Sequence, residues 1–148
     1  MVEQILSIKQ VIAEKSDFPI KKISNCTDIA SYMMKEIGSL TQENLVLLCL
    51  DTKNFVTSYS VVNIGTLNQS VAHPRDIFQR ALLSNAARIV LLHNHPSNNC
   101  MPSINDIDFT RRIEECSAIM AIELLDHIIV GTSNYYSFRE EKRLKLVS

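Results

Sequence analysis

Two histidines and one aspartate have the residue types and the spacing that could perform chemistry in this chain. His93 and His95 stand on either side of one asparagine, and Asp106 follows His95 by eleven residues. Alternate residues of a strand point to the same side, so two imidazoles spaced in this way on a strand would face one point. Two histidines and a carboxylate that leave a fourth position for water form the ligand pattern of a catalytic zinc site. The spacing therefore predicts an open metal site.

Asp106 also has a purely structural interpretation. The segment from Ser103 to Asp106 has the form of a helix capping box, with serine at the cap and an acidic residue three positions later. The two roles are compatible, because a helix start could orient a carboxylate that also binds a metal. Cys100 lies in the loop between His95 and Ser103, and a thiolate would be a good zinc ligand. Both alternatives stay open at this point.

The elements that must position these residues are predicted from hydrophobic patterning. Strands and helices alternate, which indicates an α/β fold with a mixed sheet flanked by helices. The predicted strands span residues 4–13, 43–50, 55–64, 87–92 and 124–130, and the predicted helices span residues 28–37, 74–84 and 103–120. The strand over 87–92 runs directly into His93. The strand over 124–130 is expected to be the last, followed by a short charged tail over 135–146.

Composition limits the classes of protein that this chain can represent. Its 148 residues predict one domain, here residues 25–148, preceded by an N-terminal strand and connection over residues 1–24. Positive and negative charges nearly cancel, giving a net charge of −1, whereas nucleic-acid-binding domains usually carry a basic excess. We find no apolar run long enough to span a membrane and no signal peptide. Four scattered cysteines without a CxxC pair favour free thiols and a cytoplasmic location.

The wider sequence resembles a known family. His93-x-His95, seven further residues and Ser103-x-x-Asp106 match the JAMM motif of MPN+ (JAB) metalloproteases position for position. The segments that resemble the bacterial RadC family, in the right order, are ENLVLLCLDTKN, NIGTLNQSVAHPRDIFQRALLSNAARIVLLHNHPS, PSINDIDFTRRI and ELLDHIIVG. This resemblance covers roughly residues 25–140. It implies a JAB/MPN fold, a three-layer architecture similar to that of cytidine deaminases.

The resemblance also implies roles for individual residues. His93, His95 and Asp106 would bind Zn²⁺, Glu43 would act as the general base, and the Ser103 hydroxyl would hydrogen-bond the developing oxyanion. The expected function is that of a JAMM-type zinc-dependent hydrolase that cleaves a peptide or isopeptide bond in a peptide or protein substrate. Without the motif, Glu43 would be interpreted as a solvated charge at the entry of a strand.

Three features qualify the resemblance. RadC proteins usually carry glycine after HNHPS, whereas this chain carries Asn98, a residue that tolerates left-handed backbone better than most. Asp126 and His127 also lie in a segment that resembles the family. They are interpreted as residues near the zinc, either behind its ligands or in contact with substrate. The alternative for His127 is a strand-edge histidine with a backbone partner. Only about 25 residues precede the resemblance, so we expect a short form without the N-terminal helix-hairpin-helix region.

Two other classes of function compete with the hydrolase. A zinc deaminase needs H-x-E followed by P-C-x-x-C, and the chain contains neither. A non-catalytic or DNA-repair-associated interaction module of the RadC family is the main alternative. The net charge and the expected lack of the helix-hairpin-helix region predict no strong nucleic-acid binding. The sequence does not name the substrate, and it is compatible with a homo-oligomer.

Overall fold

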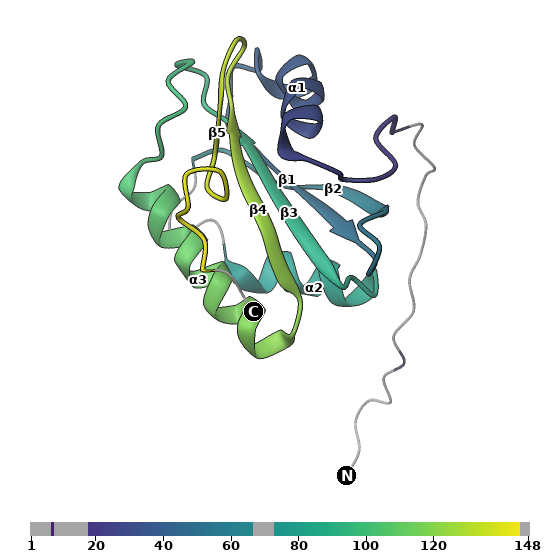
Figure 1. Cartoon of the computed structure of the whole chain (residues 1–148). Helices are drawn as coiled ribbons and strands as arrows, with labels where there is room; N and C mark the ends of the chain where they lie inside the picture. The colour runs from purple at the N-terminus through teal and green to yellow at the C-terminus, as the bar shows by residue number, and fades with distance from the viewer. Residues whose placement is uncertain (1–6, 8–17, 67–72, 146–148) are drawn as a thin grey trace.

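A computed structural model describes residues 7, 18–66 and 73–145 of the chain, and it contains a single five-stranded sheet in these ranges (Figure 1). The elements, in chain order, are α1 (Cys26–Ile37), β1 (Asn44–Leu50), β2 (Val56–Ile64), α2 (Pro74–Leu83), β3 (Arg88–Asn94), α3 (Ile104–Met120), β4 (Glu123–Val130) and β5 (Tyr135–Ser137). The strand order is β2-β1-β3-β4-β5. β3 and β4 pair in parallel and the other neighbours pair antiparallel, so the predicted α/β fold with a mixed sheet is confirmed. The strand predicted over residues 4–13 lies outside the described residues, apart from Ser7.

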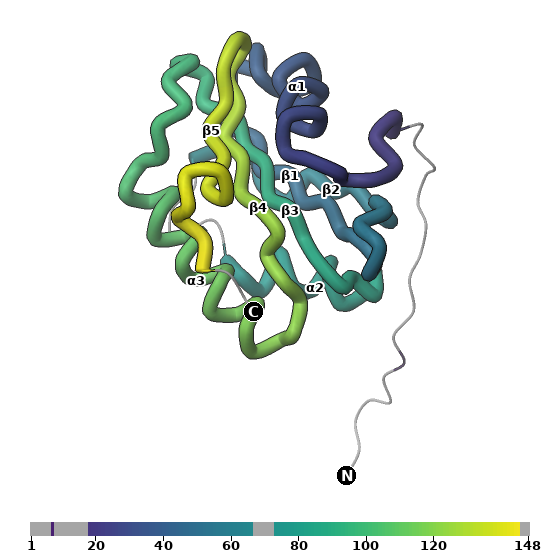
Figure 2. Tube along the Cα trace, in the orientation of Figure 1, coloured from purple at the N-terminus to yellow at the C-terminus, as the bar shows by residue number. Residues whose placement is uncertain are grey.

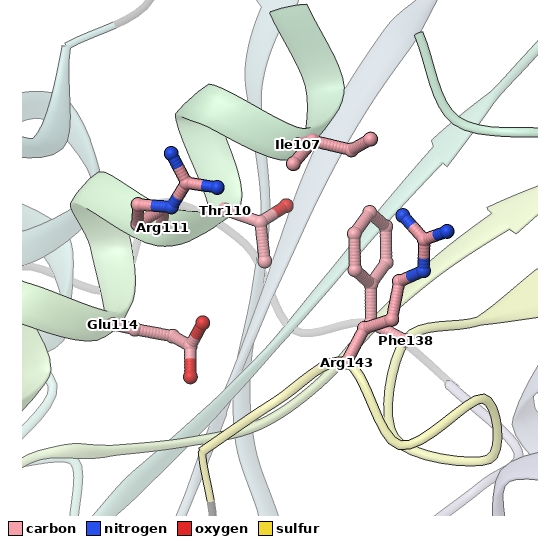
Figure 3. A pocket seen from close by; sticks show the side chains of 6 residues that line it. All are labelled: Ile107, Thr110, Arg111, Glu114, Phe138 and Arg143. Carbon is pink, nitrogen blue, oxygen red and sulfur yellow. The ribbon is translucent and has the colours of Figure 1, made fainter. Parts of the chain in front are cut away.

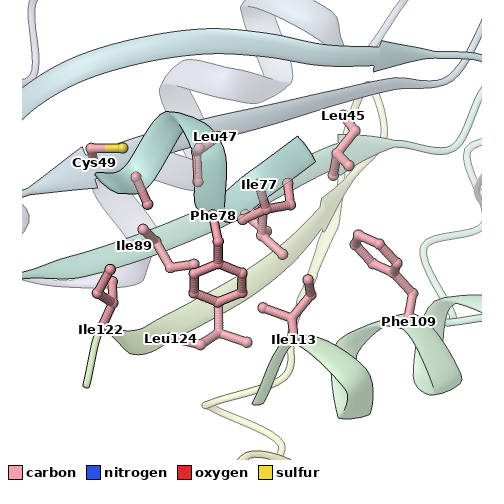
Figure 4. Packing of buried hydrophobic residues seen from close by; sticks show 12 residues of the cluster. Leu45, Leu47, Cys49, Ile77, Phe78, Ile89, Phe109, Ile113, Ile122 and Leu124 are labelled. Carbon is pink, nitrogen blue, oxygen red and sulfur yellow. The ribbon is translucent and has the colours of Figure 1, made fainter. Parts of the chain in front are cut away.

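β1 shows why the sheet needs a layer of helices on each face. It is a continuous apolar run, and the residues after Asn44 are all buried. Leu45, Leu47 and Cys49 pack into a cluster with α2 and α3, which Figure 4 shows from close by. Val46, Leu48 and Leu50 pack into a second cluster with α1 on the other face. A strand that is buried on both faces has an uninterrupted hydrophobic sequence. The fold therefore has three layers, with the sheet between α1 on one face and α2 and α3 on the other.

The helices follow the signals that their sequences carry. Asn25 caps α1, because its side chain accepts a hydrogen bond of 3.0 Å from the backbone N–H of Asp28. Pro74 stands in the first turn of α2, where its missing N–H is not needed. Within the described ranges, no helix is long and apolar enough to cross a membrane.

The C-terminal part of the chain differs from the sequence-based expectation. β4 is not the last strand, because Tyr135–Ser137 forms β5 and pairs antiparallel with β4. The segment then turns back beside β4 (Figure 2), and the buried ring of Phe138 packs there against Ile129. β5 has only three residues, which is too short for a period-two pattern to be recognised in the sequence.

Asp126 on β4 anchors this C-terminal segment. Its carboxylate accepts hydrogen bonds from the Ser137 hydroxyl, at 2.5 Å, and from the backbone N–H of Arg139, at 3.0 Å. It also accepts one from the backbone N–H of His127, at 2.7 Å. Burial raises the pKa of Asp126 to about 6, and these hydrogen bonds only partly offset that effect.

The substitution Asp126→Asn should change how stability depends on pH. A carboxyl group with a raised pKa in the folded protein takes up a proton more readily there than in the unfolded chain. Asp126 therefore lowers the free energy of unfolding as the pH rises from about 4 to about 6. The free energy of unfolding of wild type, relative to that of Asp126→Asn, should fall by up to about 3 kcal/mol across this window. Urea unfolding at a series of pH values measures the difference.

The half-exposed Asp108, which forms an ion pair with Arg111 at 3.7 Å, provides the matched control. The substitution Asp108→Asn should leave the slope of stability against pH between about 4 and 6 close to that of wild type. A difference between wild type and Asp126→Asn that stays constant with pH would contradict the raised pKa.

Candidate metal centre

The end of β3 and the start of α3 bring the three predicted ligands together. His93 is the penultimate residue of β3, paired with Leu45 of β1 and Ile129 of β4, and His95 follows the strand. Asp106 lies in the first turn of α3. His93 is completely buried, while His95 retains 9% and Asp106 2% of their surface. The cluster is therefore held in the interior by the central strands and one helix start.

The ligand atoms of these three residues converge on one another. The Nε2 atoms of His93 and His95 are 3.1 Å apart. The Asp106 carboxylate lies 3.2 Å from His93 Nε2 through Oδ1 and 3.0 Å from His95 Nε2 through Oδ2. One ligand atom from each residue lies within 4.8 Å of the other two, and no other group in the described ranges meets this criterion. The arrangement could hold a metal ion.

The chemistry of the donors fits a cation. The Nδ1 atom of His95 lies 2.7 Å from the carbonyl oxygen of Asn99, which can only accept, so Nδ1 must carry a hydrogen. In the neutral ring, Nε2 then carries the lone pair and directs it at the cluster. Two ring nitrogens 3.1 Å apart beside a carboxylate need a proton or a metal ion between them, because facing lone pairs repel. The site is therefore built around positive charge.

The pKa shifts of the same groups follow from this arrangement. Burial alone would raise the pKa of Asp106. When the rings are protonated and their Nε2 atoms carry hydrogen in place of a metal ion, hydrogen bonds from His93 and His95 outweigh burial and hold that pKa well below its usual range. Burial alone would lower the pKa of His95, but Asp106 and the Asn99 carbonyl outweigh it and raise that pKa. Both shifts favour a cation beside an ionised carboxylate.

Asp106 performs the structural role as well. Its carboxylate accepts a 2.8 Å hydrogen bond from the backbone N–H of Ser103, and the Ser103 hydroxyl accepts one of 3.1 Å from the N–H of Asp106. The predicted capping box is thus present. It fixes the carboxylate that faces the histidines, so the two interpretations of Asp106 describe one arrangement. Ser103 is exposed, and its hydroxyl keeps its own hydrogen to donate.

Glu43 lies directly before β1, at the same end of the sheet. β1 and β3 pair with Leu45 opposite His93, and continuing this register brings Glu43 opposite His95. The backbone carbonyl of Glu43 accepts a 2.7 Å hydrogen bond from the backbone N–H of Gly65. The negative charge of the Glu43 side chain contributes to the raised pKa of His95. Its carboxylate does not belong to the converging ligand atoms. Glu43 thus lies beside the cluster without joining it.

Asn94 has a role that the sequence analysis missed. It stands between the two histidines and is completely buried. Its Oδ1 accepts a 2.7 Å hydrogen bond from the backbone N–H of Asn44, and its Nδ2 donates one of 3.0 Å to the carbonyl of Gln42. Asn94 therefore ties the segment that carries Glu43 to the end of β3. The signal in the sequence is a polar residue at a buried strand position, which requires hydrogen-bond partners.

The loop after β3 is fixed by Asn98. Its φ angle is 64°, the left-handed backbone that the sequence suggested at this position. Its Oδ1 accepts a 2.7 Å hydrogen bond from the backbone N–H of Thr132, in the turn that follows β4. A Cβ atom on Gly131 would clash with this oxygen, so a larger residue there would displace the Asn98 side chain from its contact. The loop that carries the Asn99 carbonyl is thereby held against the end of β4.

Cys100 and Asp126 lie outside the cluster. The Cys100 thiol donates to the Asn134 carbonyl at 3.3 Å, and Cys100 packs against Phe138, so the structure does not bring it to the histidines. Asp126 holds the C-terminal segment, as described above. These positions give no support to Cys100 as a fourth ligand or to Asp126 as a neighbour of the metal.

His127 does approach the cluster. β4 lies between β3 and β5, so the interpretation of His127 as a strand-edge residue is wrong. Its ring is completely buried, and its Nε2 lies 2.7 Å from Nδ1 of His93. Burial lowers the pKa of His127 well below the usual histidine value, and the neighbouring His93 lowers it further. His127 is therefore a neutral ring that touches a candidate ligand.

Comparison with known proteins identifies the family of this domain. A RadC-like JAB domain matches residues 23–144 of the chain. A UPF0758 protein of Enterococcus faecalis is 46% identical over 130 residues, which cover 88% of this chain and 56% of the relative. A UPF0758 protein of Clostridium acetobutylicum is 42% identical over 142 residues, covering 93% and 62%, respectively.

The chain thus spans little more than half the length of these curated relatives. Its own match to the domain extends from Ile23, just before α1, to Leu144, beyond β5. That range contains the whole sheet, the converging histidines and Asp106. The chain belongs to the RadC-like JAB domain family.

Proposed function

We propose that this protein is a zinc-dependent hydrolase that cleaves a peptide or isopeptide bond. The observation that carries the proposal is the convergence of two imidazole nitrogens and one carboxylate in a buried site. Two nitrogens and one oxygen form a donor set that suits Zn²⁺, and three protein ligands leave a position for a reacting molecule. Membership of the RadC-like JAB family supports the same reading.

The chemistry divides between the metal and the chain. A zinc ion in such a site lowers the pKa of a water molecule to about 7 and polarises a substrate carbonyl. In the proposed mechanism, the Glu43 carboxylate accepts the proton of the attacking water and then passes it to the leaving amine nitrogen. The continuation of the β1–β3 register supports this assignment, because it brings Glu43 opposite His95. Asn94 holds the backbone on either side of Glu43.

Ser103 is proposed as the oxyanion donor. Its hydroxyl oxygen already accepts a hydrogen bond from Asp106, so its orientation is fixed while its hydrogen remains free to donate. A donor aimed at the oxygen of a tetrahedral intermediate typically contributes about 3–4 kcal/mol to transition-state stabilisation. The exposed position of Ser103 is consistent with contact to an incoming substrate.

The substitution Glu43→Gln tests the proposal. It preserves the shape of the side chain and removes the base, so hydrolysis should fall by about 10²–10⁴-fold while zinc content stays at one equivalent. Hydrolysis is measured on a mixed peptide library by mass spectrometry, and zinc is measured by elemental analysis. The exposed Glu115 of α3 offers the matched control, Glu115→Gln, which should keep both properties.

Two outcomes would contradict the roles assigned. Loss of zinc in Glu43→Gln would make Glu43 a ligand, and turnover close to wild type would make it a bystander. Wild-type protein that binds zinc but cleaves neither linear peptides nor isopeptide-linked conjugates would favour the non-catalytic interaction module instead.

A further inference from the structure

We propose that Thr110 and His127 are positioning residues that hold His93 in the tautomer able to bind a metal. This inference rests on the proposed function, because it assumes that His93 Nε2 is a metal ligand. Neither residue is itself part of the converging cluster. A relay of hydrogen bonds, from Thr110 on α3 through His127 on β4 to His93 on β3, determines which nitrogen of His93 carries the hydrogen.

The relay begins at the Thr110 hydroxyl. This group lies 2.7 Å from the backbone carbonyl oxygen of Asp106 and 2.6 Å from Nδ1 of His127. The carbonyl oxygen has no hydrogen to offer, so the Thr110 hydroxyl must donate to it. A hydroxyl has one hydrogen, so Thr110 can only accept from His127. The Nδ1 atom of His127 therefore carries a hydrogen.

The consequence passes through the His127 ring. A neutral imidazole with a hydrogen on Nδ1 has its lone pair on Nε2. That Nε2 lies 2.7 Å from Nδ1 of His93, so it accepts, and His93 Nδ1 must donate. In the neutral His93 ring the lone pair is then on Nε2, which faces His95 and Asp106. His93 thus reaches the same tautomer that the Asn99 carbonyl imposes on His95.

The surroundings leave these rings little freedom. His93 and His127 are completely buried, and Thr110 retains 2% of its surface. The His127 ring stacks on Phe138, with centroids 4.9 Å apart and planes 4° from parallel. Thr110 and Phe138 also line a pocket of about 300 Å³ between α3 and the C-terminal segment (Figure 3). The relay therefore lies between this pocket and the candidate metal centre.

The substitutions Thr110→Val and Thr110→Ser separate the hydroxyl from the shape of the side chain. Valine keeps the branched shape and removes the acceptor for His127, whereas serine keeps the hydroxyl. In metal-free protein at about pH 8.5, roughly two units above the usual histidine pKa, ¹⁵N NMR reports which nitrogens of the His93 and His127 rings carry hydrogen. Wild type and Thr110→Ser should show hydrogen on Nδ1 of both His93 and His127. Thr110→Val should show a mixture of rings with hydrogen on Nδ1 and rings with hydrogen on Nε2.

The affinity for Zn²⁺ gives the second measurement. Loss of a partner behind a metal-binding histidine typically weakens metal binding by about 10–100-fold. Titration of the metal-free protein with Zn²⁺ against a competing chelator should show a loss of this size for Thr110→Val and wild-type affinity for Thr110→Ser. His127→Phe should lose affinity as well. His127→Gln should recover most of it, because its amide can accept from His93 and donate to Thr110.

The outcomes distinguish the relay from the proposed function. Thr110→Val with hydrogen fixed on Nδ1 of both rings and wild-type Zn²⁺ affinity would overturn the relay, even if His127→Phe fails to fold. An affinity for Zn²⁺ as low in Thr110→Ser as in Thr110→Val would also overturn the relay, because the loss would then come from changed packing and not from the hydroxyl. Wild type that binds no Zn²⁺ would contradict the proposed function, whereas the tautomers in metal-free protein would still decide the relay.

Discussion

The repulsion between two buried imidazole lone pairs is the constraint on which the rest of this structure depends. The Nε2 atoms of His93 and His95 lie 3.1 Å apart, with the Asp106 carboxylate against both. Such a group of donors is stable in a protein interior only with positive charge between them, supplied by a proton or a metal ion. The lowered pKa of Asp106 and the raised pKa of His95 are two expressions of this one requirement.

The fold supplies the means to hold the donors in place. β1 and β3 are buried on both faces, so the strand end that carries His93 cannot shift without disturbing two hydrophobic clusters. The capping box of α3 fixes Asp106, and the Asn98 contact holds the loop whose carbonyl orients His95. Each support is a hydrogen bond or a packed side chain from a different element. A site with such supports is preorganised for a cation.

Much of this arrangement could be predicted from the sequence, because its signals are local. The apolar run of β1 and the capping box each lie within a few residues, and the spacing from His93 to Asp106 lies within one stretch of fourteen residues. The parts that were missed depend on contacts between distant segments. β5 was missed because three residues carry no periodic pattern, and the partners of Asn94 lie about 50 residues away along the chain. The contact between Thr110 and His127 requires α3 to pack on β4, and no sequence motif predicts that packing.

X-ray absorption at the zinc edge, on wild-type protein loaded with one equivalent of Zn²⁺, identifies the ligand atoms of the metal centre. We expect the zinc ligands to be nitrogen and oxygen atoms at about 2.0–2.1 Å, including two imidazoles, without sulfur. A sulfur shell at about 2.3 Å would bring a cysteine into the site, and a shell of oxygen alone would exclude His93 and His95. Either result would contradict a metal centre built from His93, His95 and Asp106.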